Sequence, residues 1–500
     1  MKMKNKIRVA LSLICIGAAL SVTSCIDGFK DEMTWSSGVA NTQLESPAAD
    51  KIVVTPSADG STLTVSWPIV MGAGGYSFSL YIVDDPAHPV LVGTENEIVD
   101  GTTAVRPMAE DTHYKVVIKT LGNDKYNNKE ATAATEKAWD NLLAVTAVIP
   151  DGTNLTDYFI ANPMPVSTKE LCYELVAGGS YTMNGDVAVG TQVTLRGNKI
   201  THPKVTMTNG SFVNNGAGFK MKFFDIDYST FGGTASNAII LMNATPNPNI
   251  TLSTGGYTVI PTTSPFAIQS CKITGLKYYL FFDNYSSSSP TKKYAIGTFL
   301  IKDCIIGQNS NTFNQATIRF GGGMVKDITF TNSTFYNEVV PNSSNRICQI
   351  SSGSATSVKP ATETWANGSF IINNCTFYQF PQGAQSFNSN GAMGNVGDKI
   401  TIRNSIIVNS GELASASGGN GFVRRFRRGS LNATFTGGGN TYWYNGSVPI
   451  GEISGTTADT SGDYIQTDPK LLYLGNGVFT MTGPDQITRR TGDPRWLPAQ

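Results

Sequence analysis

Residues 48–135 alternate apolar and polar side chains in short runs. Such alternation over four to eight residues is typical of strands with one buried face. The expected inward faces are Leu63, Val65 and Trp67; Tyr76, Phe78, Leu80 and Ile82; and Tyr114, Val116 and Ile118. Turn pairs such as Asp59-Gly60 and Asp85-Pro86 separate the runs. The pattern predicts about seven short strands packed as a β-sandwich.

Residues 150–500 carry a different pattern, a short motif that recurs every 29 to 45 residues. Each copy has an apolar residue, a variable residue, then Asn, Asp or Ser, then Ser or Cys, and finally a variable and an apolar residue. The copies are 222–229, 267–274, 300–307, 329–336, 371–378 and 401–408, with a degenerate copy at 433–445. One short strand pair per repeat, with loops of variable length, predicts a solenoid whose stacked coils share a core. The segment 149–163 is expected to form a short capping helix.

Two columns of side chains follow from this alignment. Small residues are expected to stack inside a narrow corner, and polar residues at a bend, where their side chains can satisfy backbone groups. The small column is Ile226, Cys271, Cys304, Ser333, Cys375 and Ser405, and the polar column is Asp225, Ser270, Asp303, Asn332, Asn374 and Asn404.

These features resemble two known folds. The polar column resembles the asparagine ladder of the pectin-lyase-like right-handed parallel β-helix. Trp67, together with Tyr114 in Thr-His-Tyr-Lys-Val, resembles the core residues of a fibronectin type III domain. The resemblances imply an all-β chain, an Ig-like or fibronectin type III sandwich at 48–135 followed by a β-helix at 150–500. A second sandwich or a propeller is the alternative for the longer region, and neither resemblance specifies an activity.

The N-terminus predicts export. Residues 1–8 are basic and residues 9–20 are apolar, which describes a secretory signal too short to cross a bilayer. The sequence Val22-Thr23-Ser24-Cys25 resembles a bacterial lipobox, which implies cleavage after residue 24 and lipidation of Cys25. An ordinary signal peptide with an incidental Cys is the alternative. Residues 25–47 are expected to be a lipidated tether whose acidic residues resemble the surface-export signal of Bacteroidetes lipoproteins. The expected location is therefore the outer-membrane surface.

Composition excludes several classes of protein. Charged residues are 15% of the chain, and the precursor has 37 basic and 37 acidic residues. Loss of residues 1–24 removes four basic residues and leaves a balance of −4. Nucleic acid is thus excluded as a partner, because its binding needs a strongly basic field. Three histidines are too few for a multi-His metal site, and five cysteines after Cys25 without a CxxC pair indicate buried thiols.

β-Helix enzymes need particular catalytic groups, which can be sought in the sequence. The lyases among them need an Arg or Lys base and an acidic Ca²⁺ site that neutralises a uronate. Arg319 and Arg425 are the candidate bases, and Asp225 and Asp227, on one face of a strand, are a candidate Ca²⁺ site if Asp283 or Asp303 stacks beside them. The hydrolase motifs Asn-Thr-Asp, Asp-Asp and Gly-His-Gly do not occur in residues 150–500.

Three groups of side chains are candidates for binding sugars. Arg424, Arg425, Arg427 and Arg428 form a run that could hold carboxylate or sulfate, with Arg425 and Arg427 on one face if the segment is a strand. Lys302 and Arg403 share an outward column with Gln269, Thr331 and Asn373. Tyr442, Trp443 and Tyr444 are candidates for stacking on sugar rings. The alternatives are a solvated turn, a plain solvent face and core packing, respectively.

The C-terminal sequences Thr467-Asp468-Pro469-Lys470 and Gly492-Asp493-Pro494-Arg495-Trp496 resemble the ends of β-helix lipoproteins of gut Bacteroidetes. Those proteins accompany polysaccharide-utilisation systems, so the resemblance implies a glycan context. We expect a noncatalytic surface lipoprotein that binds polysaccharide without a cofactor, beside outer-membrane glycan importer proteins. The alternatives are a lyase that cleaves an acidic glycan by β-elimination, with or without Ca²⁺, and an adhesin or structural surface protein.

Overall fold

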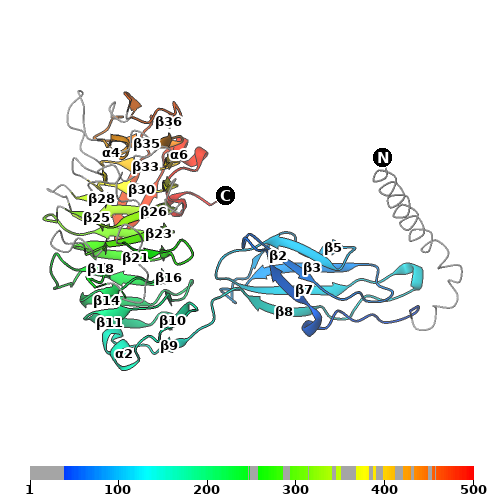
Figure 1. The fold of residues 1–500 in the computed structure, drawn as a ribbon. Coiled ribbons are helices and arrows are strands. Elements are labelled where there is room, and N and C mark those ends of the chain that lie inside the picture. Colours follow the sequence, from blue (N-terminus) through cyan, green and yellow to red (C-terminus); the bar gives the residue numbers. More distant parts are fainter. Residues whose placement is uncertain are drawn as a thin grey trace, which may run out of the picture. The chain divides into compact units, whose positions relative to one another are not determined.

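The structure is a computed structural model that divides into two compact units, Met1–Leu143 and Ala144–Gln500 (Figure 1). It describes residues 39–245, 247, 257–284, 293–313, 315–339, 345–350, 368–381, 387–389, 398–410, 421–428, 433–448, 453–456 and 458–499. No helix within these ranges is long and apolar enough to cross a membrane.

The first unit is a sandwich of two antiparallel sheets. One sheet contains β1 (Val53–Pro56), β2 (Thr62–Ser66) and β6 (Thr103–Pro107). The other contains β4 (Val90–Leu91), β3 (Tyr76–Ile82), β7 (His113–Thr120) and β8 (Thr135–Asp140), with β5 (Glu97–Val99) also paired to β3. The short 3-10 helices η1 (Ala49–Lys51) and η2 (Asp124–Tyr126) complete the unit.

The predicted inward faces form the core between these two sheets. Leu63 and Val65 of β2 pack in one cluster with Phe78 of β3 and Val116 of β7. The hydroxyl of Tyr114 accepts a hydrogen bond from the backbone nitrogen of Ala109 at 2.6 Å, five residues upstream. A tyrosine that bonds back to the preceding turn is the contact found at the corner of immunoglobulin-like sandwiches.

The expected tether is shorter than residues 25–47. The backbone nitrogens of Asn41 and Leu44 donate to the carbonyls of Tyr126 and Lys129, at 2.9 and 3.1 Å. Leu44 is buried, with 5% of its surface exposed. The last residues of the predicted tether therefore pack onto the sandwich, because an apolar side chain and backbone partners are available to them there.

The second unit is a parallel β-helix of three sheets (Figure 1). The first sheet contains β9 (Ala147–Ile149), β10 (Leu171–Leu175), β13 (Val193–Arg196), β16 (Phe219–Lys222), β20 (Phe266–Gln269), β23 (Lys293–Lys302), β26 (Met324–Thr331), β29 (Ser369–Asn373), β32 (Lys399–Arg403) and β34 (Thr434–Thr436), with β19 (Tyr257–Ile260) beside β23. The second contains β11 (Ser180–Asn184), β14 (Lys204–Asn209), β17 (Asp225–Asp227), β21 (Lys272–Leu276), β24 (Ile305–Gln308), β27 (Thr334–Asn337), β30 (Thr376–Tyr378), β33 (Ile406–Val408), β35 (Asn440–Trp443) and β36 (Tyr464–Ile465). The third contains β12 (Val187–Val189), β15 (Phe212–Asn214), β18 (Ala238–Met242), β22 (Tyr279–Phe282), β25 (Ala316–Phe320), β28 (Arg346–Ile350) and β31 (Phe387–Ser389).

Seven coils, from β10–β12 to β29–β31, contribute their strands in the order first, second, third sheet, and these strands pair in parallel with their counterparts in the next coil. Crossovers between parallel strands are right-handed as a rule. The predicted fold class, a sandwich followed by a right-handed parallel β-helix, is confirmed. Helix α2 (Leu155–Ala161) caps the first coil, as predicted, and Phe159 packs edge-on against Tyr173 at 5.0 Å.

The predicted polar column forms the bend between the first and second sheets. Its residues have left-handed backbone angles, which Asn and Asp tolerate better than most other residues. They are Ser270, Asp303, Asn332, Asn374 and Asn404, with φ of 49°, 56°, 49°, 52° and 49°. In the first copy the bend residue is Phe223, with φ of 61°, so the alignment there was wrong by two residues. A shift of two preserves the inward and outward alternation, which is why the pattern did not reveal it.

The small column is buried and unpaired, as predicted for Cys271, Cys304 and Cys375. The Ser333 hydroxyl donates to the carbonyl of Thr331 at 2.7 Å and accepts from the backbone nitrogen of Cys304 at 3.0 Å. The column thus satisfies backbone groups that the bend leaves unpaired inside the core. Burial raises the pKa of Cys304 to about 12, so its thiol stays protonated and unreactive.

The arginine run lies on a helix, α4 (Phe422–Arg428), and the strand or loop expected there is wrong. In chain order α4 follows β33, at the point where earlier coils add a strand to the third sheet. Phe422 and Phe426, four residues apart, are both fully buried, and Phe426 packs on Phe370 at 5.0 Å. This spacing is that of a helix with one apolar face.

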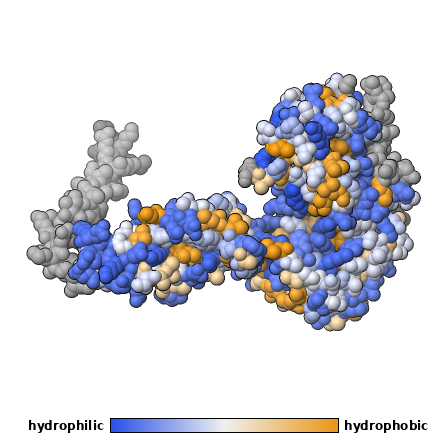
Figure 2. Space-filling view, turned by 180° about the vertical axis from the view of Figure 1, so that it is seen from behind, coloured by the Kyte–Doolittle hydropathy of each residue, from blue (hydrophilic) through white to orange (hydrophobic). Residues whose placement is uncertain are grey.

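The C-terminal segment covers part of the outer face of the second sheet. It consists of the hairpin β37 (Leu471–Gly475) and β38 (Val478–Met481), then α6 (Pro484–Arg489) and the 3-10 helix η4 (Pro494–Trp496). Ile406 and Val408 of β33 form an apolar cluster with Met481 and Trp496 of this segment. Figure 2 shows several separate groups of hydrophobic residues among hydrophilic ones on one face of the β-helix unit.

Candidate functional site

One row of side chains crosses the second sheet from coil to coil. Lys204, Asp225, Lys272, Ile305 and Thr334 are successive partners in the strand register. The first three are charged and at least partly exposed, whereas Thr334 is buried under the C-terminal segment. The second sheet therefore has a polar, open half and a covered half.

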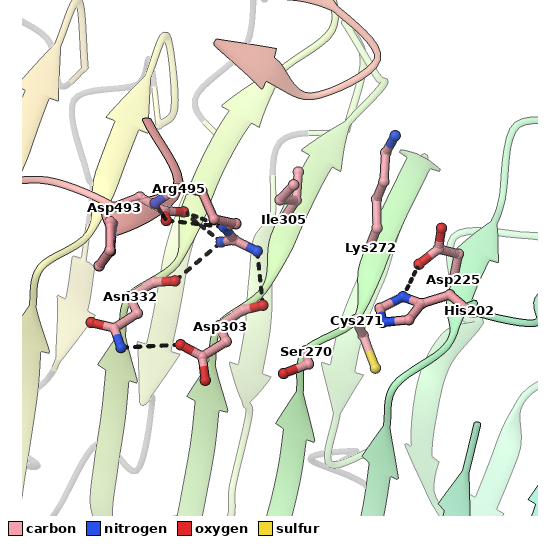
Figure 3. Close-up of a pocket in the computed structure, with 11 residues that line it drawn as sticks. His202, Asp225, Ser270, Cys271, Lys272, Asp303, Ile305, Asn332, Asp493 and Arg495 are labelled. Atoms are coloured by element: carbon pink, nitrogen blue, oxygen red, sulfur yellow. Dashed lines mark hydrogen bonds and ion pairs between the residues drawn. The ribbon is translucent and has the colours of Figure 1, made fainter. Parts of the chain in front are cut away.

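A groove of about 480 Å³ lies at the boundary between these halves (Figure 3). Its lining comes from several coils and from the end of the chain. Most of the lining residues have polar side chains, although most of the surface that they expose to the groove is apolar. The lining residues are His202, Asp225, Ser270, Cys271, Lys272, Asp303, Ile305, Asn332, Asp493, Pro494 and Arg495. Because the bend residues Ser270, Asp303 and Asn332 stack on successive coils, the groove follows the axis of the β-helix.

At one end of the groove, His202 Nδ1 lies 2.8 Å from Asp225 Oδ1. Their side chains are 28% and 36% exposed. Asp225 is also the register partner of Lys272 on the next coil, whose side chain extends away from His202 in Figure 3. The sequence does not predict the His202–Asp225 contact, because nothing in the local pattern shows that one coil brings residue 202 beside residue 225.

At the other end of the groove, the Arg495 side chain lies across two successive coils. We call this contact the Arg495 strap. Its guanidinium donates to the carbonyls of Asp303, Cys304 and Asn332, at 2.8, 2.6 and 3.1 Å. It also forms an ion pair with Asp493, which has no exposed surface and accepts from the Thr334 hydroxyl at 2.6 Å. The C-terminal motif Gly492–Trp496 thus attaches the end of the chain to two successive bends of the β-helix.

The suggested Ca²⁺ site has no ligand set among the described residues. Asp225 and Asp227 share a face of β17, as expected, but Asp225 faces His202, and Asp227 Oδ2 lies 2.8 Å from Lys204 Nζ. Although burial opposes it, hydrogen bonds from Lys204 and Ser229 hold the pKa of Asp227 below its usual value. The described residues contain no group of three or more His, Cys, Asp or Glu side chains that could hold a metal ion.

The outward column of the first sheet is aligned as the sequence indicated. The register runs from Gln269 through Lys302, Thr331 and Asn373 to Arg403. Lys302 is partly buried and Arg403 is exposed at the far end. The column lies directly before the bend and so borders the groove, but its role in binding remains a prediction.

The arginine run does not present two opposed faces. Successive residues of α4 are turned by about 100° rather than by the 180° of a strand. Arg427 donates to the carbonyl of Ala458 and its guanidinium lies 4.6 Å from the Phe435 ring centroid, so it anchors a loop. Arg424 is partly buried. The side chains of Arg425 and Arg428 lie outside the described part of the structure.

The aromatic candidates occupy different environments. Tyr442 is 1% exposed and its hydroxyl donates to Asp459 Oδ2 at 2.8 Å, so it belongs to the core and cannot stack on a sugar. Trp443 packs against the apolar cluster beneath the C-terminal segment. Tyr444 is partly buried and forms an isolated bridge with Ser447.

Arg319 lies away from the groove. It is on β25 of the third sheet, where its Nη1 donates to the Tyr279 hydroxyl at 2.8 Å. The proposed lipidation site, Cys25, precedes the described residues, so its role stays a prediction. Of the two candidate bases, Arg319 does not line the groove, and the side chain of Arg425 lies outside the described part of the chain.

Comparison with known proteins gives three family models, each described as a domain of unknown function. DUF4992 matches residues 2–178, DUF4957 matches residues 179–338 and DUF5123 matches residues 370–496. No curated protein matches the chain. Among solved structures, the pectate lyase PelI of Erwinia chrysanthemi is similar at 8% identity and a TM-score of 0.14, over 66% of this chain and 89% of that one. On its strand registers, the C-terminal unit is a parallel β-helix of three sheets.

Proposed function

We propose that this chain is a noncatalytic polysaccharide-binding lipoprotein of the outer-membrane surface. The groove along the bends of the β-helix carries the proposal (Figure 3). It runs along the axis, and side chains from successive coils, most of them polar residues, line it. Neighbouring strands repeat about every 4.8 Å, so a linear polymer laid along the axis meets a new set of polar groups at each coil.

The lining supplies the groups that sugar hydroxyls need. Asp303 and Asn332 offer carboxylate and amide oxygens as acceptors, while Lys272 and His202 offer donors. Specific ligand sites use a few positioned polar groups of this type. The Arg495 strap holds the bend in place by bonding the carbonyls of Asp303 and Asn332.

Binding explains this lining better than hydrolysis does. Glycosidases of the two-carboxylate type need one acid and one base that are both available to the substrate. In the groove Asp225 faces His202, Asp493 is paired with Arg495, and Asp303 accepts from Asn332 Nδ2 at 3.0 Å. Asp225 and Asp493 are therefore committed to protein partners, which leaves Asp303 without a second free carboxylate in the lining, although its remaining lone pairs can accept from a sugar hydroxyl.

The lipid anchor and the location belong to the same proposal. Diacylglycerol on Cys25 would hold the protein at the membrane, since several acyl chains give stable attachment. A binder at the cell surface would deliver polysaccharide to outer-membrane glycan importer proteins. The sandwich would then serve as a spacer between the anchor and the β-helix.

The test is isothermal titration of Asp225→Asn and Lys272→Met with a panel of neutral and acidic polysaccharides. We expect each change to weaken binding by roughly tenfold, the effect of losing one charge-assisted hydrogen bond. Asp84→Asn is the matched control, because Asp84 holds His113 at 3.1 Å in a similar pair on the sandwich. Affinities that are unchanged in both variants would remove the groove as the site, and no binding to any glycan would favour an adhesin.

A second candidate function is β-elimination on an acidic polysaccharide, and the His202–Asp225 pair favours it. An imidazole oriented by a carboxylate is a suitable general base. It would take the proton α to a uronate carboxylate, a carbon–carbon double bond would form, and the glycosidic oxygen on the β carbon would leave and take a proton from water. Lys272 on the next coil would supply positive charge for the uronate carboxylate. Absorbance growing near 235 nm on mixing with a uronate polymer, and lost in His202→Ala, would establish the lyase and refute the noncatalytic proposal.

A further inference from the structure

The third sheet carries two charged residues among its seven strands. They are Arg319 on β25 and Arg346 on β28, which are neighbouring parallel strands. The other residues of these strands are apolar or uncharged polar. Two cations side by side on an otherwise uncharged sheet are unfavourable unless something of opposite charge joins them.

The two guanidiniums converge on one point of the sheet. Arg319 is the register partner of Gln349, and Arg346 Nη1 donates to the Gln349 Oε1 atom at 3.4 Å. Arg319 is held in place by the Tyr279 hydroxyl at 2.8 Å, and its guanidinium lies 5.4 Å from the Phe282 ring centroid. These contacts fix where Arg319 points without cancelling its charge.

Neither arginine has a carboxylate partner among the described residues. Two other cations of the β-helix do have such partners, Arg196 with Glu174 at 2.7 Å and Lys220 with Glu170 at 2.8 Å. The Nε atoms of Arg319 and Arg346 are buried and have no hydrogen-bond partner among the described residues. Burial, and after it the charge of Arg319, lower the pKa of Arg346, as expected for two neighbouring cations.

The acid at the end of the neighbouring strand β22 is bonded to backbone groups. Asp283 follows β22 directly, but its carboxylate accepts hydrogen bonds from the backbone nitrogens of Gly321, Gly322 and Gly323, at 2.8, 3.0 and 2.7 Å. It organises a glycine turn after β25, where its negative charge is satisfied by backbone donors. The pair of arginines is therefore left with an excess of positive charge.

We propose that Arg319 and Arg346 together bind one oxyanion, the carboxylate or the sulfate ester of an acidic polysaccharide. Guanidinium groups match carboxylate and sulfate geometry through paired hydrogen bonds, and both side chains remain partly exposed. An anion between them would offset the repulsion between the two cations. The anion site stands on its own geometry, while its polymeric source rests on the proposed function.

The experiment titrates the full chain and two variants, Arg319→Gln and Arg346→Gln, with four probes. The probes are sodium sulfate, a polygalacturonate, a dextran sulfate and neutral dextran. We expect an acidic polymer to bind the native chain and to lose roughly tenfold or more in affinity in each variant, because each loses a charge-assisted contact. Lys399→Gln, at an exposed position on the first sheet, removes the same charge and should bind as the native chain does.

Thermal unfolding separates binding from folding. Removing one of two repelling cations should leave the melting temperature unchanged or higher, and an acidic polymer should raise it in the native chain but not in the variants. Lower melting temperatures for both variants without ligand would mean that the arginines are structural, and would overturn the proposal. So would equal affinity of variants and native chain for every acidic probe.

The two proposals can fail separately. If sulfate ion binds through the two arginines but no polysaccharide does, the anion site stands and the glycan function falls. If neutral dextran binds the native chain and no acidic probe does, the glycan function stands and the anion site falls. Arg319→Lys, which keeps the charge and loses the planar fork, should bind an acidic polymer with intermediate affinity.

Discussion

The Arg495 strap allows a sharp test of how the β-helix is held together. Replacing Arg495 by Ala removes three hydrogen bonds to bend carbonyls and leaves Asp493, which has no exposed surface, without its cation. Breaking a buried ion pair from one side costs about 3–5 kcal/mol, because the remaining charge is neither solvated nor paired. We expect the unfolding free energy of the β-helix to fall by that amount, measured by urea denaturation followed by circular dichroism.

The control is the neighbouring pair of Arg489 with Asp463, 2.6 Å apart with side chains 39% and 53% exposed. An exposed pair contributes about 0–1 kcal/mol, so Arg489→Ala should shift the urea midpoint little. Adding Asp493→Asn to Arg495→Ala should restore part of the loss, because the uncompensated charge is gone. Equal effects of Arg495→Ala and Arg489→Ala, or no rescue by Asp493→Asn, would refute this account of the strap.

The same variant predicts a pH dependence. Burial raises the pKa of Asp493 in the native chain, although hydrogen bonds and charge from Arg495 oppose it. Without Arg495 the pKa of this carboxyl should rise further above its unfolded value. A folded-state pKa that is raised means stability is greatest at low pH and falls as the pH rises through that pKa. Arg495→Ala should therefore be closer to the native chain at pH 5 than at pH 8.

Three further predictions concern other parts of the chain. Cys304→Asp should cost several kcal/mol in urea denaturation, because it buries a charge beside carbonyls, whereas Cys304→Ser should cost far less, since Ser333 already occupies the same column; equal small losses would contradict the buried column. Cys25→Ala should leave an unlipidated species in the soluble fraction, and unchanged mass and membrane fractionation would remove the lipoprotein assignment. Arg427→Ala should lower the melting temperature without changing glycan affinity, because Arg427 anchors a loop and packs on Phe435; lost affinity at unchanged stability would return the arginine run to the binding site.

Local chemistry in the sequence was enough to predict the architecture. The inward faces of the sandwich follow from alternation alone, and Tyr114 bonds back to the preceding turn as a corner tyrosine does. The coils were visible because each bend needs a residue that tolerates a left-handed backbone, followed by a small one that fits inside the corner. Asn332 and Ser333 meet both needs within two positions.

The sequence pattern led to wrong predictions where the alternation of inward and outward residues is ambiguous. The first bend was misplaced by two residues, because Phe223 takes the left-handed conformation where the pattern suggested Asp225. The segment 422–428 was expected to be a strand or loop, yet two apolar residues four apart fit a helix equally well in so short a run. In both cases packing against neighbouring coils decided between patterns that the chain permits.

The candidate sites could not be predicted from the sequence, for a different reason. Loops of variable length separate the coils, so the residues that become neighbours across strands cannot be counted from the motif spacing. His202 contacts Asp225, Arg319 lies on the strand next to that of Arg346, and Arg495 reaches Asp303 from the far end of the chain. Each contact depends on the register of stacked coils, which backbone hydrogen bonding and core packing set together. The sequence by itself determined which residues face inward and where the chain bends, and the tertiary structure alone decided which polar side chains meet.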